Sequence, residues 1–345
     1  MQIETIDPAH DSTWETFIQE TPEATPFHTG AWAKVLRDTY DFQPRYMVAR
    51  KENGQLAAGI PLFEVNGSRL VGIPFSDYCP PLLPDSEDSR VLVAELKRTT
   101  ENGTSALELR GASTLDLEAE GFTRTDAFLQ HIIDLDAEIE ELESRFRANV
   151  RRTIRKAKRS GLTVRAGEKL SDMERFYELN MVTRRRHGLI PQPWRFFENI
   201  HRHVISCGGG VLLFCEYEGR VIAADIVLGY GTKLLGKFNA SDMRYRALGP
   251  NNLLQMATIE LGVADGYSEI NLGRTEPEHE GLRRFKLGWG SREEPLPYYY
   301  YPADKTGSWS TGNTPPGQQL MAIFVRFAPS WALRMAGAAI YKRAA

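Results

Sequence analysis

The chain has few cysteines, no long apolar run and no excess of one charge, and each absence excludes a class of protein. Its three cysteines, Cys79, Cys207 and Cys215, lie far apart and form no Cys-x-x-Cys pair. This spacing argues against a disulfide framework or a zinc ribbon and favours a reducing compartment. No apolar stretch reaches the ~18 residues of a membrane span. The acidic first residues lack the basic start and apolar run of a signal peptide. These absences predict a cytoplasmic protein.

The sequence contains one predicted structural pattern twice, as an internal repeat. Residues 45–110 and 211–274 each predict strand, turn, strand, strand, helix, strand, with the two copies at a nearly constant offset. The repeat is far longer than a solenoid unit, and 345 residues are enough for two domains with cores of their own. The sequence therefore predicts an internally duplicated α+β protein with mixed α/β sheets.

A basic helix lies between the two copies. The helix, predicted from about 137 to 160, has acidic residues in its first turns and eight cations after them. Acidic residues first and basic residues last suit the helix dipole, but like charges four residues apart repel. Two interpretations stay open: a solvated face, or a surface that binds phosphate groups or a nucleic-acid backbone. The cations are Arg145, Arg147, Arg151, Arg152, Arg155, Lys156, Lys158 and Arg159.

The two copies differ in the turn that joins the third strand to the helix. In the second copy, a strand at 233–241 leads to Arg246-Ala-Leu-Gly249-Pro-Asn251-Asn252 and then to a helix. Free amides and the positive end of the helix dipole at such a turn bind anions, although Pro250 removes one amide donor. The first copy has a proline-rich stretch at 80–86 instead. The alternative is a plain strand-to-helix turn with proline in the first helical position.

The order of two helices, three strands, a helix and a strand resembles that of the GNAT superfamily of N-acyltransferases. GNAT enzymes hold the pyrophosphate of acyl-CoA with an Arg/Gln-x-x-Gly-x-Gly/Ala turn, and this chain matches it except for Asn251 in place of the last small residue. The resemblance implies two tandem GNAT-like domains. It also implies that the donor-binding residues are Arg246, Gly249, Asn251 and Asn252.

Three stretches together resemble the Fem-type family, tandem-GNAT transferases related to the enzymes that build peptidoglycan cross-bridges. The nearest group is the Fem-like and BioF2-like acetyltransferase-domain proteins associated with cell-envelope polysaccharides, and the likeness covers about residues 10–345. The stretches are Asn149–Gly161, Gly249–Leu254, and Gly273-Arg274 followed by Gly281–Gly290, which contains the specific element Phe-Lys-x-x-Trp-Gly.

The family resemblance implies domain limits and an activity. Residues 1–130 would form a degenerate, acceptor-side GNAT-like domain, and residues 131–302 a second domain with the basic helix, the donor turn and the Phe-Lys-x-x-Trp-Gly element. The tail 303–345 would pack back on the first domain, and the acceptor would lie in a cleft between the domains. The family transfers an aminoacyl group from aminoacyl-tRNA to an amine of a peptidoglycan precursor. This chain lacks the long coiled-coil insertion that some members use for tRNA, so acyl-CoA is the alternative donor, and no permanently bound cofactor is expected.

The resemblance also implies site residues. Lys286 would be the catalytic cation beside the developing oxyanion or a donor phosphate; the alternative is a solvated surface lysine. Asp77, at the end of a first-copy strand, is a general-base candidate or a turn residue. His279 is a candidate proton acceptor, but no second ligand has metal spacing, so we expect no metal. The expected acceptor-phosphate ligands are Arg151, Arg152, Arg155 and Arg274.

Three functions stay open. The first is transfer of an aminoacyl or acyl group to an amine of a phosphorylated or lipid-linked envelope precursor. The second is acyl-CoA-dependent N-acetylation of a small amine, and the third is binding without catalysis. The apolar tail 318–345, with interspersed arginine and lysine, either packs on the first domain or makes peripheral contact with the inner face of the membrane.

Overall fold

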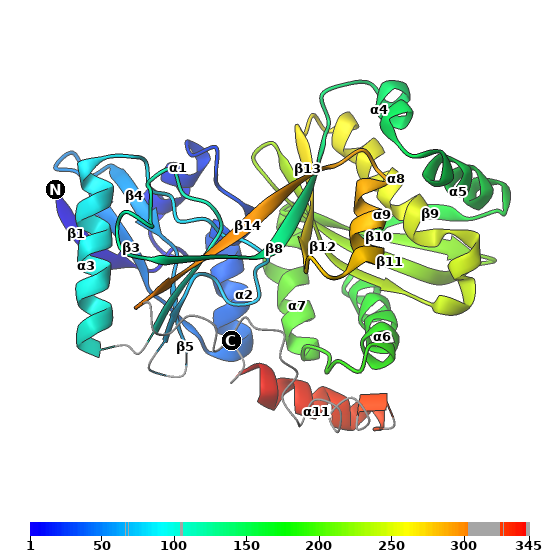
Figure 1. Cartoon of the computed structure of the whole chain (residues 1–345). Coiled ribbons are helices and arrows are strands. Elements are labelled where there is room, and N and C mark those ends of the chain that lie inside the picture. The colour runs from blue at the N-terminus through cyan, green and yellow to red at the C-terminus, as the bar shows by residue number, and fades with distance from the viewer. Residues whose placement is uncertain (66, 68, 104–105, 303–324, 327, 343–345) are drawn as a thin grey trace. The chain divides into compact units, whose positions relative to one another are not determined.

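The computed structural model describes residues 1–65, 67, 69–103, 106–302, 325, 326 and 328–342. Within them the chain forms two compact units, drawn in Figure 1. Residues 1–129, 295–302, 341 and 342 belong to the first unit, and residues 130–294, 325, 326 and 328–340 to the second. The strands β8 (Thr123–Asp134) and β14 (Arg292–Tyr301) each have residues in both units.

The first unit begins with a strand and two capped helices. Asp11 and Thr29 are the N-caps of the helices α1 and α2, because their side-chain oxygens accept hydrogen bonds from the amides of Thr13 and Trp32. The elements of this unit are β1 (Gln2–Ile6), α1 (Ser12–Gln19), η1 (Pro26–His28), α2 (Gly30–Tyr40), β2 (Gln43–Pro44), β3 (Tyr46–Arg50), β4 (Leu56–Ile60), β5 (Phe63–Val65), β6 (Arg69–Val71), α3 (Glu87–Gly103) and β7 (Ala106–Arg110).

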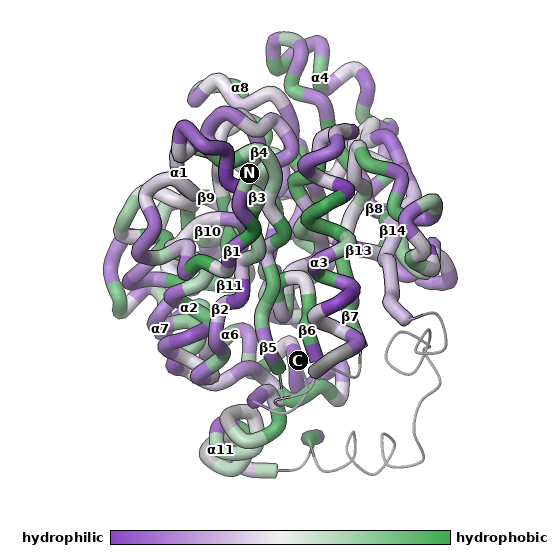
Figure 2. The backbone as a smooth tube through the Cα atoms, turned by 90° about the vertical axis from the view of Figure 1, so that its left-hand side faces the viewer, coloured by the Kyte–Doolittle hydropathy of each residue, from purple (hydrophilic) through white to green (hydrophobic). Residues whose placement is uncertain are grey.

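The strands of the first unit lie in two sheets. One has the order β1-β3-β4, and the other contains β2-β5-β6-β7-β14. Strand β6 is parallel to β7, and α3 makes the crossover that a parallel pair requires. Leu92, Val93 and Leu96 of α3 are buried in one cluster with Leu107 and Leu109 of β7. Figure 2 shows the mixture of hydrophobic and hydrophilic residues on α3 that suits a helix with one buried face.

The second unit repeats this arrangement with longer strands. Helices α6 and α7 cover one face of β10–β12, where Phe196 and Phe197 contact Phe238, and α8 covers the other (Figure 1). Its elements are α4 (Ile139–Arg145), α5 (Ala148–Arg159), β9 (Thr163–Gly167), α6 (Leu170–Arg186), α7 (Trp194–His203), η2 (Ile205–Cys207), β10 (Gly210–Tyr217), β11 (Arg220–Tyr230), β12 (Lys233–Ser241), η3 (Met243–Leu248), α8 (Pro250–Ala264), β13 (Glu269–Thr275), α9 (Glu280–Leu287) and α11 (Ser330–Tyr341).

The duplicated order predicted from the sequence is confirmed in the topology. Each unit has a strand, a crossover helix and a parallel strand in succession: β6, α3 and β7 in the first, and β12, α8 and β13 in the second. The strand before them differs. In the first unit it is interrupted at Pro61, so that β4 and β5 lie in different sheets, whereas β11 of the second unit is continuous. The fold class is a mixed α/β structure, as expected.

The single basic helix predicted over 137–160 is wrong, because the chain forms two helices there. Phe146 has an extended backbone with φ −73° and ψ 146°, and it ends α4. Its ring packs edge-to-face on Trp289 at 5.0 Å between centroids, and the amide of Arg147 donates to the carbonyl of Gly288 at 2.9 Å. Burial of one aromatic side chain therefore outweighs continuation of the helix.

The part of the tail at 303–324, for which packing on the first domain and membrane contact were predicted, lies outside the described residues. In the second unit, the guanidinium of Arg334 lies 5.2 Å from the ring centroid of Tyr177. In the first, the ring of Tyr341 packs on Phe75 at 5.4 Å. Among the helices that the structure describes, none has the length and apolar character needed to cross a membrane.

Candidate active site

The side chain of Lys286 is buried at the end of β13. Lys286 lies on α9 and is 5% exposed, so it is not the solvated surface lysine that was the alternative. Its ammonium donates to the carbonyl of Gly273 at 2.7 Å, to Oγ1 of Thr275 at 2.7 Å and to the carbonyl of Arg274 at 3.3 Å. The structure thus brings Lys286 and Arg274, two predicted site residues, together at a strand end, where binding residues are often found.

A buried polar network that the sequence did not reveal lies beside Lys286. His131 of β8 is fully buried, and its Nε2 lies 2.9 Å from a carboxylate oxygen of Glu293, which also accepts two hydrogen bonds from Arg283. Burial and the nearby Lys286 ammonium lower the pKa of His131, although Glu293 acts in the opposite direction. These effects favour the neutral form of the His131 ring. Its Nδ1 is buried and has no hydrogen-bond partner in the part of the chain that the structure describes.

The turn predicted to bind the donor leads into α8 with proline in the first helical position, which is also the arrangement of the alternative interpretation. Gly249 has φ 80° and ψ 39°, the left-handed region that favours glycine, and it is followed by Pro250 in the first position of α8. Asn251 and Asn252 are in the first turn of this helix, and the side-chain amide of Asn251 lies 3.5 Å from that of Asn239 on β12. Arg246 is exposed on η3 immediately before the turn.

Helix α5 packs against this turn. The ammonium of Lys156 donates to the carbonyl of Ala247 at 2.7 Å, and the side chain of Thr153 faces Gly249. Arg152 and Arg155 are exposed on the same helix. Arg151 has another contact, because its guanidinium donates to the carbonyls of Glu143 and Ser144 at the end of α4. The basic helix is thus part of the surroundings of the donor turn.

We predict that Gly249→Ala will lower the free energy of unfolding by about 2 kcal/mol, because alanine is strained in left-handed backbone. Its Cβ would also lie 2.4 Å from Cγ2 of Thr153. Thr153→Ser removes that methyl group and should restore only the steric part of the loss. Urea unfolding of the two single variants and the double variant measures this. Equal stability of Gly249→Ala and wild type would contradict it.

Strands β12 and β13 pair over only part of their described lengths. They pair only over Lys233–Leu235 and Glu269–Asn271, and Lys237 is an extra residue in the register of β12 with β11. On the neighbouring strand β11, the carboxylate of Asp225 accepts a hydrogen bond of 2.6 Å from Asn239 of β12. Burial raises the pKa of Asp225 to about 7. One feature of the sequence marks this residue: Asp225 is a lone carboxylate inside the apolar strand Val221–Leu228.

Asp77 belongs to the first unit, and its carbonyl accepts a 2.8 Å hydrogen bond from the hydroxyl of Tyr298. It follows two non-glycine residues with positive φ, Ile73 at 40° and Phe75 at 62°. The amide of Ser76 donates to the carbonyl of Ile73 at 3.2 Å, so a turn lies immediately before Asp77, in agreement with the interpretation of Asp77 as a turn residue.

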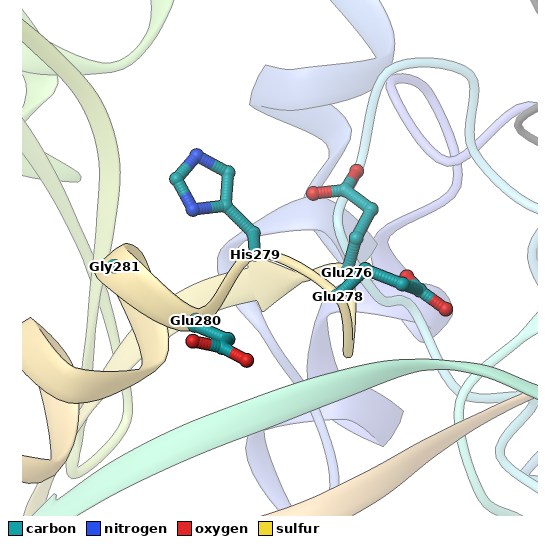
Figure 3. Close-up of a pocket in the computed structure, with 5 residues that line it drawn as sticks. All are labelled: Glu276, Glu278, His279, Glu280 and Gly281. Carbon is teal, nitrogen blue, oxygen red and sulfur yellow. The ribbon is translucent and has the colours of Figure 1, made fainter.

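The acidic loop after β13 lines a hollow of about 540 Å³ formed by Glu276, Glu278, His279, Glu280 and Gly281. Figure 3 shows that the imidazole and the carboxylates point in different directions. His279 caps α9, because its Nδ1 accepts from the amide of Leu282 at 3.2 Å. Within the described residues, no group of three or more His, Cys, Asp or Glu side chains is placed to hold a metal ion.

The chain is similar to known proteins in the sequence of one region and in its fold. Residues 144–293 match the model of the acetyltransferase (GNAT) domain. No curated protein sequence matches the chain. Among solved structures, FemX is similar with a TM-score of 0.72 and 16% identity, over 87% of this chain and 97% of that one. A tandem GNAT protein from the clavulanic acid biosynthesis pathway has a TM-score of 0.55 and 14% identity, over 87% and 97%.

A third similar structure is the C-terminal domain, from Agrobacterium fabrum, of a protein described as a lysylphosphatidylglycerol synthetase. Its TM-score is 0.57 and its identity 17%, over 78% of this chain and 87% of that one. At these identities the three structures establish the fold, and the activity of each belongs to that protein alone.

Proposed function

We propose, from the match of residues 144–293 to the acetyltransferase (GNAT) domain, that the protein transfers an aminoacyl or acyl group to an amine of a peptidoglycan or polysaccharide precursor of the cell envelope. The observation that carries the proposal is the buried ammonium of Lys286 at the end of β13. The fold shared with FemX and with the synthetase domain from Agrobacterium fabrum supports an envelope acceptor.

A fixed cation near the reacting carbonyl assists this reaction. When an amine attacks an ester or thioester, the new N–C bond forms, a negative charge develops on the carbonyl oxygen, and the C–O or C–S bond to the donor then breaks as one proton leaves the amine. A fixed positive group in a site of low dielectric stabilises that oxygen much more than it would in water. We assign this role to the positive charge of Lys286, because its three N–H groups already donate to Gly273, Arg274 and Thr275. Arg274, whose carbonyl it contacts, is the adjacent acceptor-phosphate ligand.

The donor side is assigned to the turn at Gly249 and to helix α5. The positive end of α8 and the exposed Arg246 would face the donor phosphates. Because α5 packs on this turn, we now assign Arg152 and Arg155 to donor phosphates in place of the acceptor phosphates that the sequence suggested. Arg151, which contacts the end of α4, is left with a structural role.

A specific observation also favours a second candidate, acyl-CoA-dependent acetylation of a small amine. The pairing of β12 with β13 ends at Leu235 and Asn271, and Lys237 is an extra residue in β12. In this alternative an extended ligand would bind between the two strands beyond that point. The likeness to a tandem GNAT protein supports this alternative. It differs from the first proposal in its donor and in its acceptor.

The donor is tested by offering labelled acetyl-CoA and labelled aminoacyl-tRNAs separately to the purified chain. We expect tRNA binding whose affinity falls steeply with salt, since several phosphates would be neutralised, and which Arg152→Gln/Arg155→Gln weakens about tenfold or more. Lys342→Gln, a charge change outside the second unit, is the matched control. A large rise in melting temperature with acetyl-CoA and no tRNA binding would favour the second candidate. If the chain binds neither acetyl-CoA nor aminoacyl-tRNA, both candidate functions are excluded for these donors.

A further inference from the structure

A carboxylate lies in the sheet of the second unit, close to the donor turn. Asp225 is on β11, and its Oδ1 accepts a 2.6 Å hydrogen bond from the side-chain amide of Asn239 on β12. The nitrogen of that amide also lies 3.5 Å from Oδ1 of Asn251, in the first turn of α8. Side chains from three neighbouring elements of one unit therefore connect the carboxylate to the donor turn.

The Asp225 side chain faces α8 and can be reached by a ligand. Ala223 and Val227, which lie two residues before and after it, are buried in clusters with residues of α8. Residues two apart in a strand point to the same face of the sheet, so Asp225 points toward α8 as well. Asp225 is only partly buried, and Asn239 beside it is exposed. The carboxylate is therefore open to a molecule bound at the start of α8.

This carboxylate and the Lys286 ammonium border the same unpaired stretch of the sheet. Strands β12 and β13 are parallel, and their pairing ends at Leu235 and Asn271. Asn239 and Thr275 each lie four residues further along these strands. The carboxylate is hydrogen-bonded to the first of them and the Lys286 ammonium to the second. One charged group is thus held on each side of the unpaired stretch.

Asp225 has no ion pair with any lysine or arginine in the part of the chain that the structure describes. A carboxylate in a partly buried place is normally paired, because its ionised form loses hydration there. Glu216 of the adjacent strand β10, for example, binds Arg165 at 2.7 Å. Burial raises the pKa of Asp225 to about 7, and a bound cation would offset that effect.

We propose that Asp225 determines donor specificity by binding the α-ammonium group of an aminoacyl donor whose phosphates lie at the donor turn. An aminoacyl ester carries this ammonium beside its reacting carbonyl, whereas an acetyl group carries no charge. Asn239 keeps the carboxylate in place, and a hydrogen bond between an ammonium and a carboxylate is about twice as strong as one between neutral groups. This inference rests on the proposed transferase function and narrows its donor to an aminoacyl group.

The test compares donors that differ in this ammonium. Alanyl-CoA and isobutyryl-CoA have acyl groups of nearly the same shape, and charged tRNA is matched by the same tRNA with its α-amino groups acetylated. We expect the full chain to bind the ammonium-bearing member of a pair about tenfold more tightly or better, and Asp225→Asn to remove the preference. Asp265→Asn, the same change of charge at an exposed position just after α8, is the matched control and should keep it.

Two outcomes would overturn the inference. One is equal affinity of the wild type for both members of every pair that binds, and the other is a preference that survives Asp225→Asn. The expected preference without transfer to any acceptor would uphold the inference while the transferase function fails. If neither pair binds, the probe is L-alaninamide, and the carboxyl carbon of Asp225 is followed by NMR. A fall in the pKa of Asp225 with added L-alaninamide would uphold the inference, and an unchanged pKa would overturn it.

Discussion

Replacing Asp225 by asparagine should raise the free energy of unfolding of the second unit at pH 8, by up to about 4 kcal/mol. The cause is burial, which raises the pKa of Asp225 from 3.8 to about 7. A carboxyl group whose pKa is higher in the folded state destabilises the fold as pH rises, because the unfolded chain ionises first. Asparagine has nearly the same shape, carries no charge and can still accept the hydrogen bond from Asn239.

Because the pKa of Asp225 is raised in the folded state, the effect of this residue on stability depends on pH. Stability of the wild type should fall as pH rises from about 4 to about 7 and then stay level. The gain in Asp225→Asn should accordingly be less than half as large at pH 5 as at pH 8. Calorimetric melting of both proteins at the two pH values measures the difference.

Asp172 offers a control of opposite sign. Burial opposes ionisation there, but hydrogen bonds from the amides of Lys169 and Glu168 and from Arg165 outweigh it and lower the pKa of Asp172. Its stabilising effect is complete above pH 4, so Asp172→Asn should destabilise the unit equally at pH 5 and pH 8. A pH-independent gain or a loss in Asp225→Asn would contradict the account of Asp225.

Lys286→Met should reduce transferase activity by about a hundredfold to a thousandfold, the usual effect of removing a fixed group that stabilises an oxyanion. It should also lower the melting temperature, because two carbonyls and the Thr275 hydroxyl lose their donor. Two variants separate these effects. Thr275→Val removes one acceptor and leaves the ammonium, so it should lower stability with little loss of kcat. Arg284→Met, at an exposed position of the same helix, should change neither.

A loss of kcat in Thr275→Val as large as that in Lys286→Met would mean that activity depends on the conformation at the end of β13 and not on the charge of Lys286. Lys286 would then be a structural residue. Equal kcat in Lys286→Met and wild type would exclude any role for its charge in the reaction.

The element order could be predicted from the sequence because it depends on local patterns, such as alternation in strands and the glycine turn before α8. The break between α4 and α5 could not, since it depends on Phe146 packing against Trp289, far along the chain. The ionisation of Asp225 depends on its burial and on Asn239 of the neighbouring strand. The positive φ angles of Ile73 and Phe75 could not be predicted either, because neither residue is a glycine.

Among the candidate site residues, those that lie within short motifs could be predicted from the sequence. Lys286 and Gly249 lie in such motifs. In the structure, Lys286 donates to the carbonyl of Gly273, and Gly249 is the N-cap residue of α8. Arg151 is similar in type to Arg152 and Arg155, and only the structure separates it by its contact with the end of α4. His131 and Glu293 lie far apart in the sequence and meet through strand pairing.

The most direct measurement is the mass of the acceptor after incubation with the protein and a donor. A lysine-containing peptidoglycan precursor peptide and a small amine would each be offered with charged tRNAs and with acetyl-CoA. Our account predicts that the wild type adds one aminoacyl or acyl group to the amine of the precursor, and that Lys286→Met does so at least a hundredfold more slowly. Unchanged acceptor masses with every donor, or equal product from the two proteins, would contradict it.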